Sequence, residues 1–249
     1  MTPIRSIVLV LVLCGCGANP VDAVTINPNE LATGLVAHWT FDEGTGTVAA
    51  DRSGNRHDGQ LTGGSWLPSG RFAGALDLAA GDYVTVSTFP QATPAWTVSA
   101  WVRTSAEQLV AGASQGWKTI LSTENVFAGG WQLYLDIRSD FKQFDAAYWA
   151  GTSATDYVVA NCDCVEVGQW IHLTAVFDDI SGELRFYRDE ALMDRRAMPV
   201  PILAGDPTLY IGRWNQDGRF LAASLDDVAI WSRALDAAEI AVLSRQPAP

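Results

Sequence analysis

The chain of 249 residues is acidic, with 16 Lys and Arg against 28 Asp and Glu and a net charge of −12. It carries no basic patch, which excludes nucleic acid and anionic lipid surfaces as expected partners. The length suits one large domain, and ten Trp and nine Phe can supply a sizeable hydrophobic core.

The first fifteen residues have the features of a bacterial secretion signal. Arg5 supplies a positive charge, and the apolar run 7–13 is far shorter than the ~20 residues that span a bilayer. The run ends in the sequence LCGC at 13–16, which resembles a lipobox with Cys16 as the acylated residue. We therefore expect residues 1–15 to be a lipoprotein signal peptide and the lipid on Cys16 to be the only contact with the membrane.

Gly17 follows Cys16, so Asp is absent from the position that retains many lipoproteins in the inner membrane. We therefore expect the protein in the cell envelope, at the bacterial outer membrane. An ordinary secretory signal, which would give a secreted protein, stays open as the alternative.

Residues 16–33 contain Pro and several small polar residues, as tethers do. We expect one folded domain over residues 34–246. Strand signals recur in it about every ten to fifteen residues, for example as apolar residues at alternate positions of 131–137 and 171–177. This pattern predicts an all-β protein in which one face of each strand enters the core.

A β-hairpin is predicted where residues 183–187 and 191–194 flank Arg188, Asp189 and Glu190. A type I′ turn needs positive φ at both central positions, which Asn-Gly or Asp-Gly supplies. Glu190 stands where Gly is usual and would cost roughly 1 kcal/mol in such a turn. A longer loop is the alternative.

One helix is expected near the C-terminus. Asp236 suits the N-cap, Glu239 stands three residues on, and Ile240 and Leu243 follow at helical spacing. Two prolines close the chain after it.

Six segments occur in the order of the strands of one family. They are LVAHWTFDE at 35–43, FAGALDL at 72–78, DYVTV at 82–86, WTVSAWV at 96–102, WIHLTAV at 170–176 and LDDVAIW at 225–231. Together they resemble a laminin-G-like, concanavalin A-like domain. The resemblance implies a two-sheet antiparallel jelly-roll sandwich of the lectin/glucanase type with one short C-terminal helix.

Members of this family usually bind carbohydrate or protein, and many hold a structural Ca²⁺ near the meeting point of the first and last strands. By position, the resemblance makes Asp42 and Asp226 the expected calcium ligands, with help from backbone carbonyls. Ca²⁺ takes about six to eight oxygen ligands, which paired strand ends can provide. The loop 51–58 is a second oxygen-rich candidate. The alternative is that these acids cap turns or face solvent.

Once the signal is removed and Cys16 is lipidated, Cys162 and Cys164 are the remaining cysteines. Two thiolates do not complete a zinc site. In an oxidising envelope we expect them to form a disulfide across one residue. Two free thiols or an intermolecular bond stay open as alternatives.

The segment 140–165 departs most from the family's usual length and content. It places aromatic rings among Asp and Thr side chains, a combination that suits sugar binding. Tyr148, Trp149 and Asp156 are therefore the expected ligand-binding residues. Packing of the rings inside the sandwich is the alternative.

We expect no enzymatic activity. Glycoside hydrolases of this fold aim two carboxylates from one strand face at the scissile bond, and the chain lacks a Glu-x-Asp-x-Glu run. The sequence favours a non-catalytic, envelope-anchored binding module for carbohydrate or a surface protein. The alternatives are a structural or assembly lipoprotein without a glycan ligand and a glycoside hydrolase.

Overall fold

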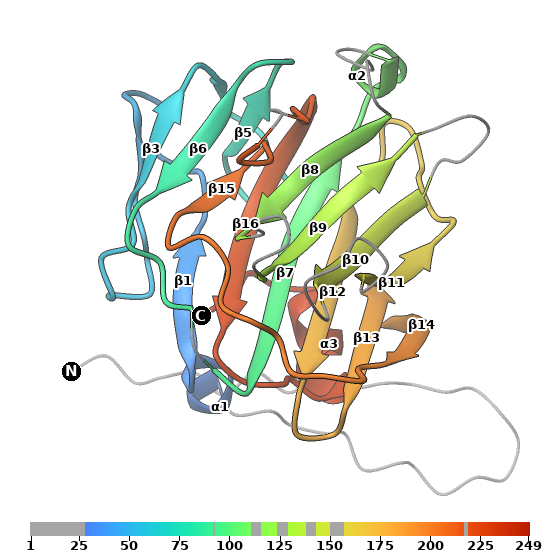
Figure 1. The fold of residues 1–249 in the computed structure, drawn as a ribbon. Coiled ribbons are helices and arrows are strands. Elements are labelled where there is room, and N and C mark those ends of the chain that lie inside the picture. The colour runs from blue at the N-terminus through green and yellow to red at the C-terminus, as the bar shows by residue number, and fades with distance from the viewer. Residues whose placement is uncertain are drawn as a thin grey trace, which may run out of the picture.

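The computed structural model describes residues 28–91, 93–110, 116–123, 129–137, 143–149, 157–216 and 219–249. They form two antiparallel β-sheets that pack face to face, as Figure 1 shows. The two-sheet, all-β sandwich predicted from the alternating strand signals is confirmed.

The first sheet, sheet A, brings the two ends of the domain together. Its strands follow the order β14-β13-β12-β7-β16-β5-β4, and β1 also pairs with β16. In chain order these strands are β1 (Leu35–Trp39), β4 (Ser65–Leu67), β5 (Ala75–Leu78), β7 (Ala95–Arg103), β12 (Ile171–Asp178), β13 (Glu183–Arg188), β14 (Ala191–Ala197) and β16 (Ala223–Trp231). The first and last strands of the described chain therefore lie side by side.

The second sheet, sheet B, follows the order β11-β10-β9-β8-β15-β6-β3-β2. In chain order its strands are β2 (Val48–Ala49), β3 (Gly59–Thr62), β6 (Tyr83–Val86), β8 (Trp117–Ser122), β9 (Trp131–Asp136), β10 (Gln143–Trp149), β11 (Tyr157–Cys162) and β15 (Leu209–Ile211). The segment 140–165 thus supplies the β10–β11 hairpin at one edge of this sheet.

The core lies between the sheets because apolar side chains alternate along the strands. In β9 the inward side chains are Trp131, Leu133 and Leu135, each at most 1% exposed. Across the core, β7 contributes Trp96 and Val98. Since successive side chains of a strand point to opposite faces, the remaining side chains of each strand lie on an outer face.

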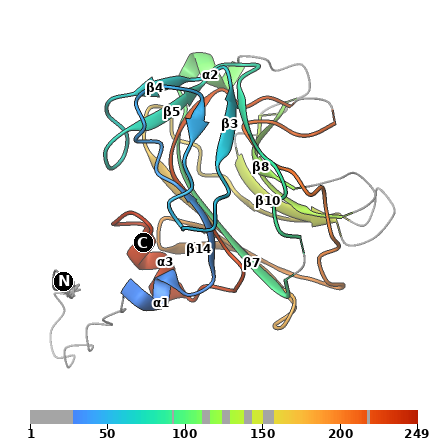
Figure 2. The ribbon, with the colours of Figure 1, turned by 90° about the vertical axis from the view of Figure 1, so that its left-hand side faces the viewer.

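Two helices cover part of the outer face of sheet A. Helices α1 (Pro28–Ala32) and α3 (Ala237–Leu243) lie close together there, as Figures 1 and 2 show. With sheet A they form a second apolar cluster, which includes Leu31, Trp231 and Ile240. The Trp231 indole N–H donates to the Leu31 carbonyl oxygen at 2.7 Å, so the cluster also has a buried polar contact.

The folded domain extends beyond the expected range of 34–246 at both ends. Helix α1 lies inside the expected tether 16–33, and burial of Leu31 makes the helix part of the domain. At the other end Ala248 is buried, and its backbone N–H donates to the Asp227 carboxylate at 3.0 Å. Residues 28–33 are therefore not a tether.

Helix α3 confirms the predicted C-terminal helix. The Asp236 carboxylate accepts hydrogen bonds from the backbone N–H groups of Ala238 and Glu239, both at 2.9 Å. The Glu239 carboxylate accepts from the Asp236 N–H, which completes a capping box. Helices α1 and α2 (Ala106–Val110) were not predicted, because five residues are too few for a helical period. None of the described helices is long and apolar enough to cross a membrane.

The predicted β13–β14 hairpin forms with a two-residue turn. Arg188 pairs with Ala191, so Asp189 and Glu190 are the central residues. Asp189 has a φ of 54°, whereas the φ of Glu190 is negative. A type I′ turn requires positive φ at both positions, so this turn is of another type and the cost expected for Glu190 does not arise.

Candidate functional site

The outer face of sheet B carries polar and aromatic side chains at the centre of the sheet. In β9, Tyr134 and Asp136 alternate with the core residues and therefore point outward. Tyr134 is paired with Asp145 of β10, and Asp136 with Trp117 of β8. Paired residues share a face, so three adjacent strands contribute to one surface.

Two buried carboxylates lie on this surface beside a tyrosine. Asp136 and Asp145 are at most 2% exposed. Burial, the charges of Asp145 and Asp136, and a hydrogen bond to Asp145 together raise the pKa of Tyr134. The Tyr134 hydroxyl therefore stays protonated and donates to the Asp145 carboxylate. Gln143 Nε2 donates to the same carboxylate at 2.9 Å.

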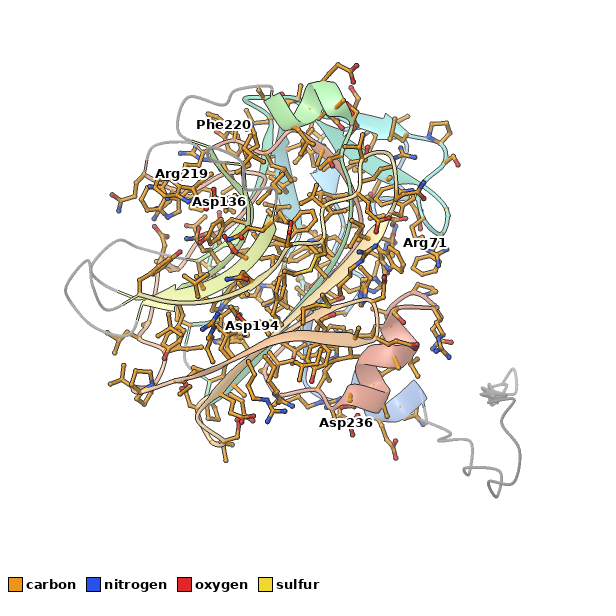
Figure 3. All side chains as sticks on the ribbon, turned by 90° about the vertical axis from the view of Figure 1, so that its right-hand side faces the viewer. Arg71, Asp136, Asp194, Arg219, Phe220 and Asp236 are labelled. Carbon is orange, nitrogen blue, oxygen red and sulfur yellow. A yellow bond between two sulfur atoms is a disulfide. The ribbon has the colours of Figure 1, made fainter. Side chains whose placement is uncertain are left out.

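A stacked arginine lies next to these acids. The Arg219 guanidinium carbon is 3.8 Å from the centre of the Trp214 ring and 4.6 Å from that of Trp117. Figure 3 shows Arg219, Phe220 and Asp136 on the same side of the sandwich. The loop that carries Arg219 is fixed to β8, because the Thr119 N–H donates to the Arg219 carbonyl oxygen at 2.9 Å.

A second arginine extends the surface toward β6. The Arg213 guanidinium carbon lies 4.7 Å from the Tyr83 ring centre, 5.1 Å from that of Tyr210 and 5.8 Å from that of Phe220. These three rings are partly exposed. Arg213 is held by its own loop, since its Nε donates to the Trp214 carbonyl oxygen at 3.1 Å.

Three buried polar atoms near the stacked arginine have no hydrogen-bond partner among the residues that the structure describes. They are Thr119 Oγ1, Trp214 Nε1 and Asn215 Oδ1. Buried polar groups are nearly always hydrogen-bonded, so such atoms indicate where water or a ligand completes the network. We call the whole surface the sheet B face; its members are Trp117, Thr119, Gln132, Tyr134, Asp136, Asp145, Tyr157, Tyr83, Tyr210, Arg213, Trp214, Asn215, Arg219 and Phe220.

The expected ligand-binding residues are not brought together as predicted. The Tyr148 ring is fully buried, packs against Phe177 with ring centres 6.4 Å apart, and donates its hydroxyl to the Val200 carbonyl oxygen. A ring without exposed surface cannot stack on a sugar, so the assignment of Tyr148 to a binding site is wrong. The backbone of Trp149 pairs with Tyr157 in the β10–β11 hairpin.

The Trp149 side chain and all of Asp156 lie outside the described residues. The segment nevertheless contributes to the sheet B face, through Asp145 of β10 and through Tyr157 of β11, whose hydroxyl accepts a hydrogen bond from Gln132 Nε2. The sequence did not lead us to predict the rest of the face. A pattern that could have indicated it is the polar set Gln132, Tyr134 and Asp136, which alternates with the apolar residues of β9.

Asp42 and Asp226, the expected calcium ligands, converge on the loop 70–74 from two sides. Asp226 Oδ2 accepts from the backbone N–H groups of Arg71 and Phe72 at 2.6 and 3.0 Å, and Asp42 Oδ1 accepts from Gly74 at 2.6 Å. Burial, followed by the charges of Asp227 and Asp42, raises the pKa of Asp226 to about 6.

Backbone oxygens surround the same point. A Cβ at Gly74 would lie 2.7 Å from the Phe41 carbonyl oxygen, and one at Gly70 would lie 1.9 Å from the Gly74 carbonyl oxygen and 2.6 Å from Asp226 Oδ2. Only glycine leaves room for this set of oxygens. The described residues contain no group of three or more His, Cys, Asp and Glu side chains arranged to hold a metal. A cation here would therefore depend on carbonyls as well as on the two carboxylates.

In the loop 51–58, the second calcium candidate, the Asp51 carboxylate is occupied by backbone hydrogen bonds. The Asp51 carboxylate accepts from the backbone N–H groups of His38, Ser53 and His57, each at 2.9 Å. Burial opposes ionisation of Asp51, but these hydrogen bonds outweigh it and lower its pKa. Asp51 thus organises a turn against β1, as the alternative interpretation of this loop expected.

A disulfide joins Cys162, the last residue of β11, to Cys164. Both residues are buried and belong to the core between the sheets. Cys16, the expected lipidation site, lies outside the described residues.

The family model of the concanavalin A-like lectin/glucanases superfamily matches residues 78–241. The chain belongs to this superfamily. The family inferred from the six strand segments is thereby confirmed. No sequence of a curated protein matches the chain.

Several solved structures share the fold. The receptor binding domain of botulinum neurotoxin D is 16% identical with a TM-score of 0.65, and the match covers 86% of this chain and 53% of that one. The serotype D ligand binding domain in complex with N-acetylneuraminic acid is also 16% identical, with a TM-score of 0.66 and coverages of 87% and 52%. This chain spans about half the length of these neurotoxin chains.

A third structure matches over nearly its whole length. Domain 4 of AbnA, a GH43 extracellular arabinanase from Geobacillus stearothermophilus, in complex with arabinotriose, is 18% identical with a TM-score of 0.65. The match covers 85% of this chain and 98% of that one. At such identities the likeness establishes the fold.

Proposed function

We propose that this protein is a non-catalytic carbohydrate-binding module and that the sheet B face is its binding surface. One observation carries the proposal: partly exposed rings and hydrogen-bonding side chains are interleaved on a rigid sheet. The rings of Trp117, Tyr210 and Phe220 offer flat apolar surfaces to the C–H faces of sugars. Carboxylates, amides and arginines beside them suit sugar hydroxyls, which both donate and accept hydrogen bonds.

The similar structures support a glycan as the ligand. Two of them were solved with a saccharide, arabinotriose in one and N-acetylneuraminic acid in the other. These two sugars differ in size and charge, so the fold supports more than one specificity. The identity of the sugar therefore has to come from the side chains on the sheet B face.

The surroundings of the two acids support a binding role rather than a catalytic one. A glycoside hydrolase needs one carboxylic acid to protonate the leaving group and a second carboxylate facing the sugar. Asp145 is instead engaged by Tyr134 and Gln143 and has almost no exposed surface. We expect no release of reducing sugar from any polysaccharide that the protein binds.

The test is a glycan array probed with the full chain and two variants. Trp117→Ala removes a ring from the sheet B face and should weaken binding about tenfold or more, because the stacking contact and the apolar area that the ring buries against the sugar are both lost. Trp66→Ala removes a ring of similar exposure from β4 in sheet A and should bind like the unmodified chain. Absence of any glycan ligand would refute the proposal and favour a structural or assembly protein.

We further propose that the protein is a lipoprotein of the bacterial cell envelope, anchored through Cys16. The apolar run 7–13 and the LCGC sequence support this location. Mass spectrometry of the protein extracted from membranes should find a diacylglyceryl thioether on Cys16. A soluble product with an unmodified Cys16 would contradict the anchor.

We also propose a structural Ca²⁺ held by Asp42, Asp226 and the carbonyl oxygens of Phe41 and Gly74. The hard oxygens, and the negative charges of Asp227 and Asp42 near the buried Asp226 carboxylate, support a cation of this kind. A ligand that binds only the folded state raises its stability, by about 2.7 kcal/mol at 100 times the dissociation constant. Thermal melting in Ca²⁺ and in EDTA should therefore differ, and Asp226→Asn should remove the difference. Identical melting curves would refute the site.

A further inference from the structure

A pocket of about 500 Å³ opens on the outer side of sheet A, next to the end of α3. Its walls include Arg71, Trp101, Trp170, Asp189, Glu190 and Arg245. Figure 3 shows Arg71 on the opposite side of the molecule from Arg219 and Phe220. The pocket therefore shares no residue with the sheet B face, and its volume lies in the range of small-molecule sites.

Arg71 is the cation of this pocket that lacks a counter-ion among the described residues. Its guanidinium carbon lies 4.4 Å from the Trp101 ring centre, and within the part of the chain that the structure describes its side chain forms no ion pair. Arg245, by contrast, pairs with Glu190. Asp189 accepts from the His172 N–H and lies 3.6 Å from Arg188 Nε. An anion that enters the pocket would therefore find one uncompensated guanidinium.

The backbone holds Arg71 in place independently of its side chain. The Arg71 N–H donates to Asp226 Oδ2 at 2.6 Å, so the loop 70–74 is fixed to β16. Substitution of the side chain leaves this contact intact. The guanidinium is thus presented over Trp101 by a rigid part of the sandwich.

The tryptophans of the pocket supply a second, independent observation. Trp101 is 3% exposed, yet its buried indole N–H has no hydrogen-bond acceptor among the described residues. Trp170 is partly exposed and is braced by Arg103, whose guanidinium carbon lies 4.7 Å from the ring centre. An unsatisfied donor beside an unpaired cation suits a ligand rich in acceptor oxygens.

We propose that this pocket binds an acidic saccharide unit, with its carboxylate on Arg71 and its ring against the partly exposed Trp170. A guanidinium binds a carboxylate through two parallel N–H···O bonds, which gives both strength and orientation. The exposed carboxylates of Asp189 and Glu190 lie at the rim and can accept hydrogen bonds from sugar hydroxyls. A simple carboxylic acid such as acetate has no hydroxyl groups to donate to them. This site goes beyond the proposed glycan binding on the sheet B face, and the failure of either proposal leaves the other intact.

The test is an NMR titration of the full chain, in which the indole N–H signals report on the tryptophans. D-Glucuronic acid should shift the Trp101 signal, assigned through Trp101→Phe, at up to about 10 mM ligand. Its methyl ester has the same ring without the charge and should bind at least about tenfold more weakly, as expected for the loss of a charged hydrogen bond. Absence of a shift with the acid, or equal shifts with acid and ester, would overturn the proposal.

Variants separate the guanidinium from general effects. Arg71→Gln should weaken binding of glucuronic acid at least about tenfold, and Arg71→Lys should restore part of it, because the charge returns without the planar fork. Arg195→Gln removes an exposed arginine from β14 and should change nothing. Unchanged affinity in Arg71→Gln would contradict the site. Acetate or an aspartate-containing peptide that binds as tightly as glucuronic acid would overturn its assignment to a saccharide.

Discussion

The two outer faces of the sandwich differ in what covers them. On sheet A, α1 and α3 seal an apolar cluster around Trp231, and the ends of the domain are fixed there. On sheet B, arginines lie on partly exposed rings, and three buried polar atoms have no hydrogen-bond partner among the described residues. In both sheets alternate side chains point outward, so the types of side chain on each outer face determine its role. The covered part of sheet A therefore contributes mainly to stability, whereas we propose that the sheet B face binds the ligand.

Trp231→Ala should have the largest effect on stability, because this fully buried ring also bonds to Leu31. Truncation of a large core aromatic costs about 3–5 kcal/mol of unfolding free energy. Urea unfolding followed by circular dichroism measures it. Trp117→Ala on the sheet B face should cost about 1 kcal/mol, since its ring is partly exposed. Equal losses of unfolding free energy in Trp231→Ala and Trp117→Ala would contradict the difference between the two faces.

Acid should destabilise the protein through His172 of β12. The ring is fully buried with Nε2 2.7 Å from Ser99 Oγ, and burial lowers its pKa to about 3. The unfolded chain takes up a proton below about pH 6.5, whereas the folded protein does not. Stability is therefore lost as pH falls from 6.5 toward 3, by up to about 1.4 kcal/mol per pH unit.

The variant His172→Gln retains a hydrogen-bonding group but does not titrate. Its unfolding free energy, measured in urea between pH 7 and pH 4 as for the unmodified protein, should fall less steeply. Parallel pH profiles for the two proteins would show that His172 contributes nothing to acid sensitivity.

Arg233 links the two helices that cover sheet A. Its guanidinium donates to Glu239 at 2.6 and 2.9 Å and to the carbonyl oxygens of Glu30 and Thr33. Arg233→Gln should cost about 2 kcal/mol and increase hydrogen exchange in α1. The exposed pair of Arg195 with Glu183 provides the comparison, and Arg195→Gln should cost less than about 1 kcal/mol.

The smallest effect concerns the cap of α3. Asp236→Ala removes the carboxylate that accepts from two backbone N–H groups and should cost about 1 kcal/mol in thermal unfolding. Asp236→Asn retains the acceptor and should cost less. If both variants melt at the temperature of the unmodified protein, the capping box contributes nothing measurable.

Local patterns predicted the fold well, because each depends on few residues. Alternation in 131–137 predicted a strand, and Asp236 with Glu239 predicted the start of a helix. Tyr148 was misassigned although it lies on the same face of its strand as the core residues Phe144 and Ala146, four and two positions before it. The alternation of residues along the strand was thus a better indicator than the aromatic content of the segment.

The sheet B face could not be predicted in the same way. Trp117, Tyr134 and Asp145 come from three strands whose register appears only after pairing, and Arg219 arrives from a loop. A sequence shows the polar side of one strand but not which strand lies next to it. The chemistry of this surface is therefore a property of the assembled sheet.

The most direct test of the central claim is hydrogen exchange of the full chain with a glycan that the array identifies. Binding on the sheet B face should slow exchange in β8, in β9 and at residues 212–216 and 219–221, and should leave α1 and α3 unchanged. Protection that is confined to the helices and the outer face of sheet A would contradict the assignment of the binding surface to sheet B.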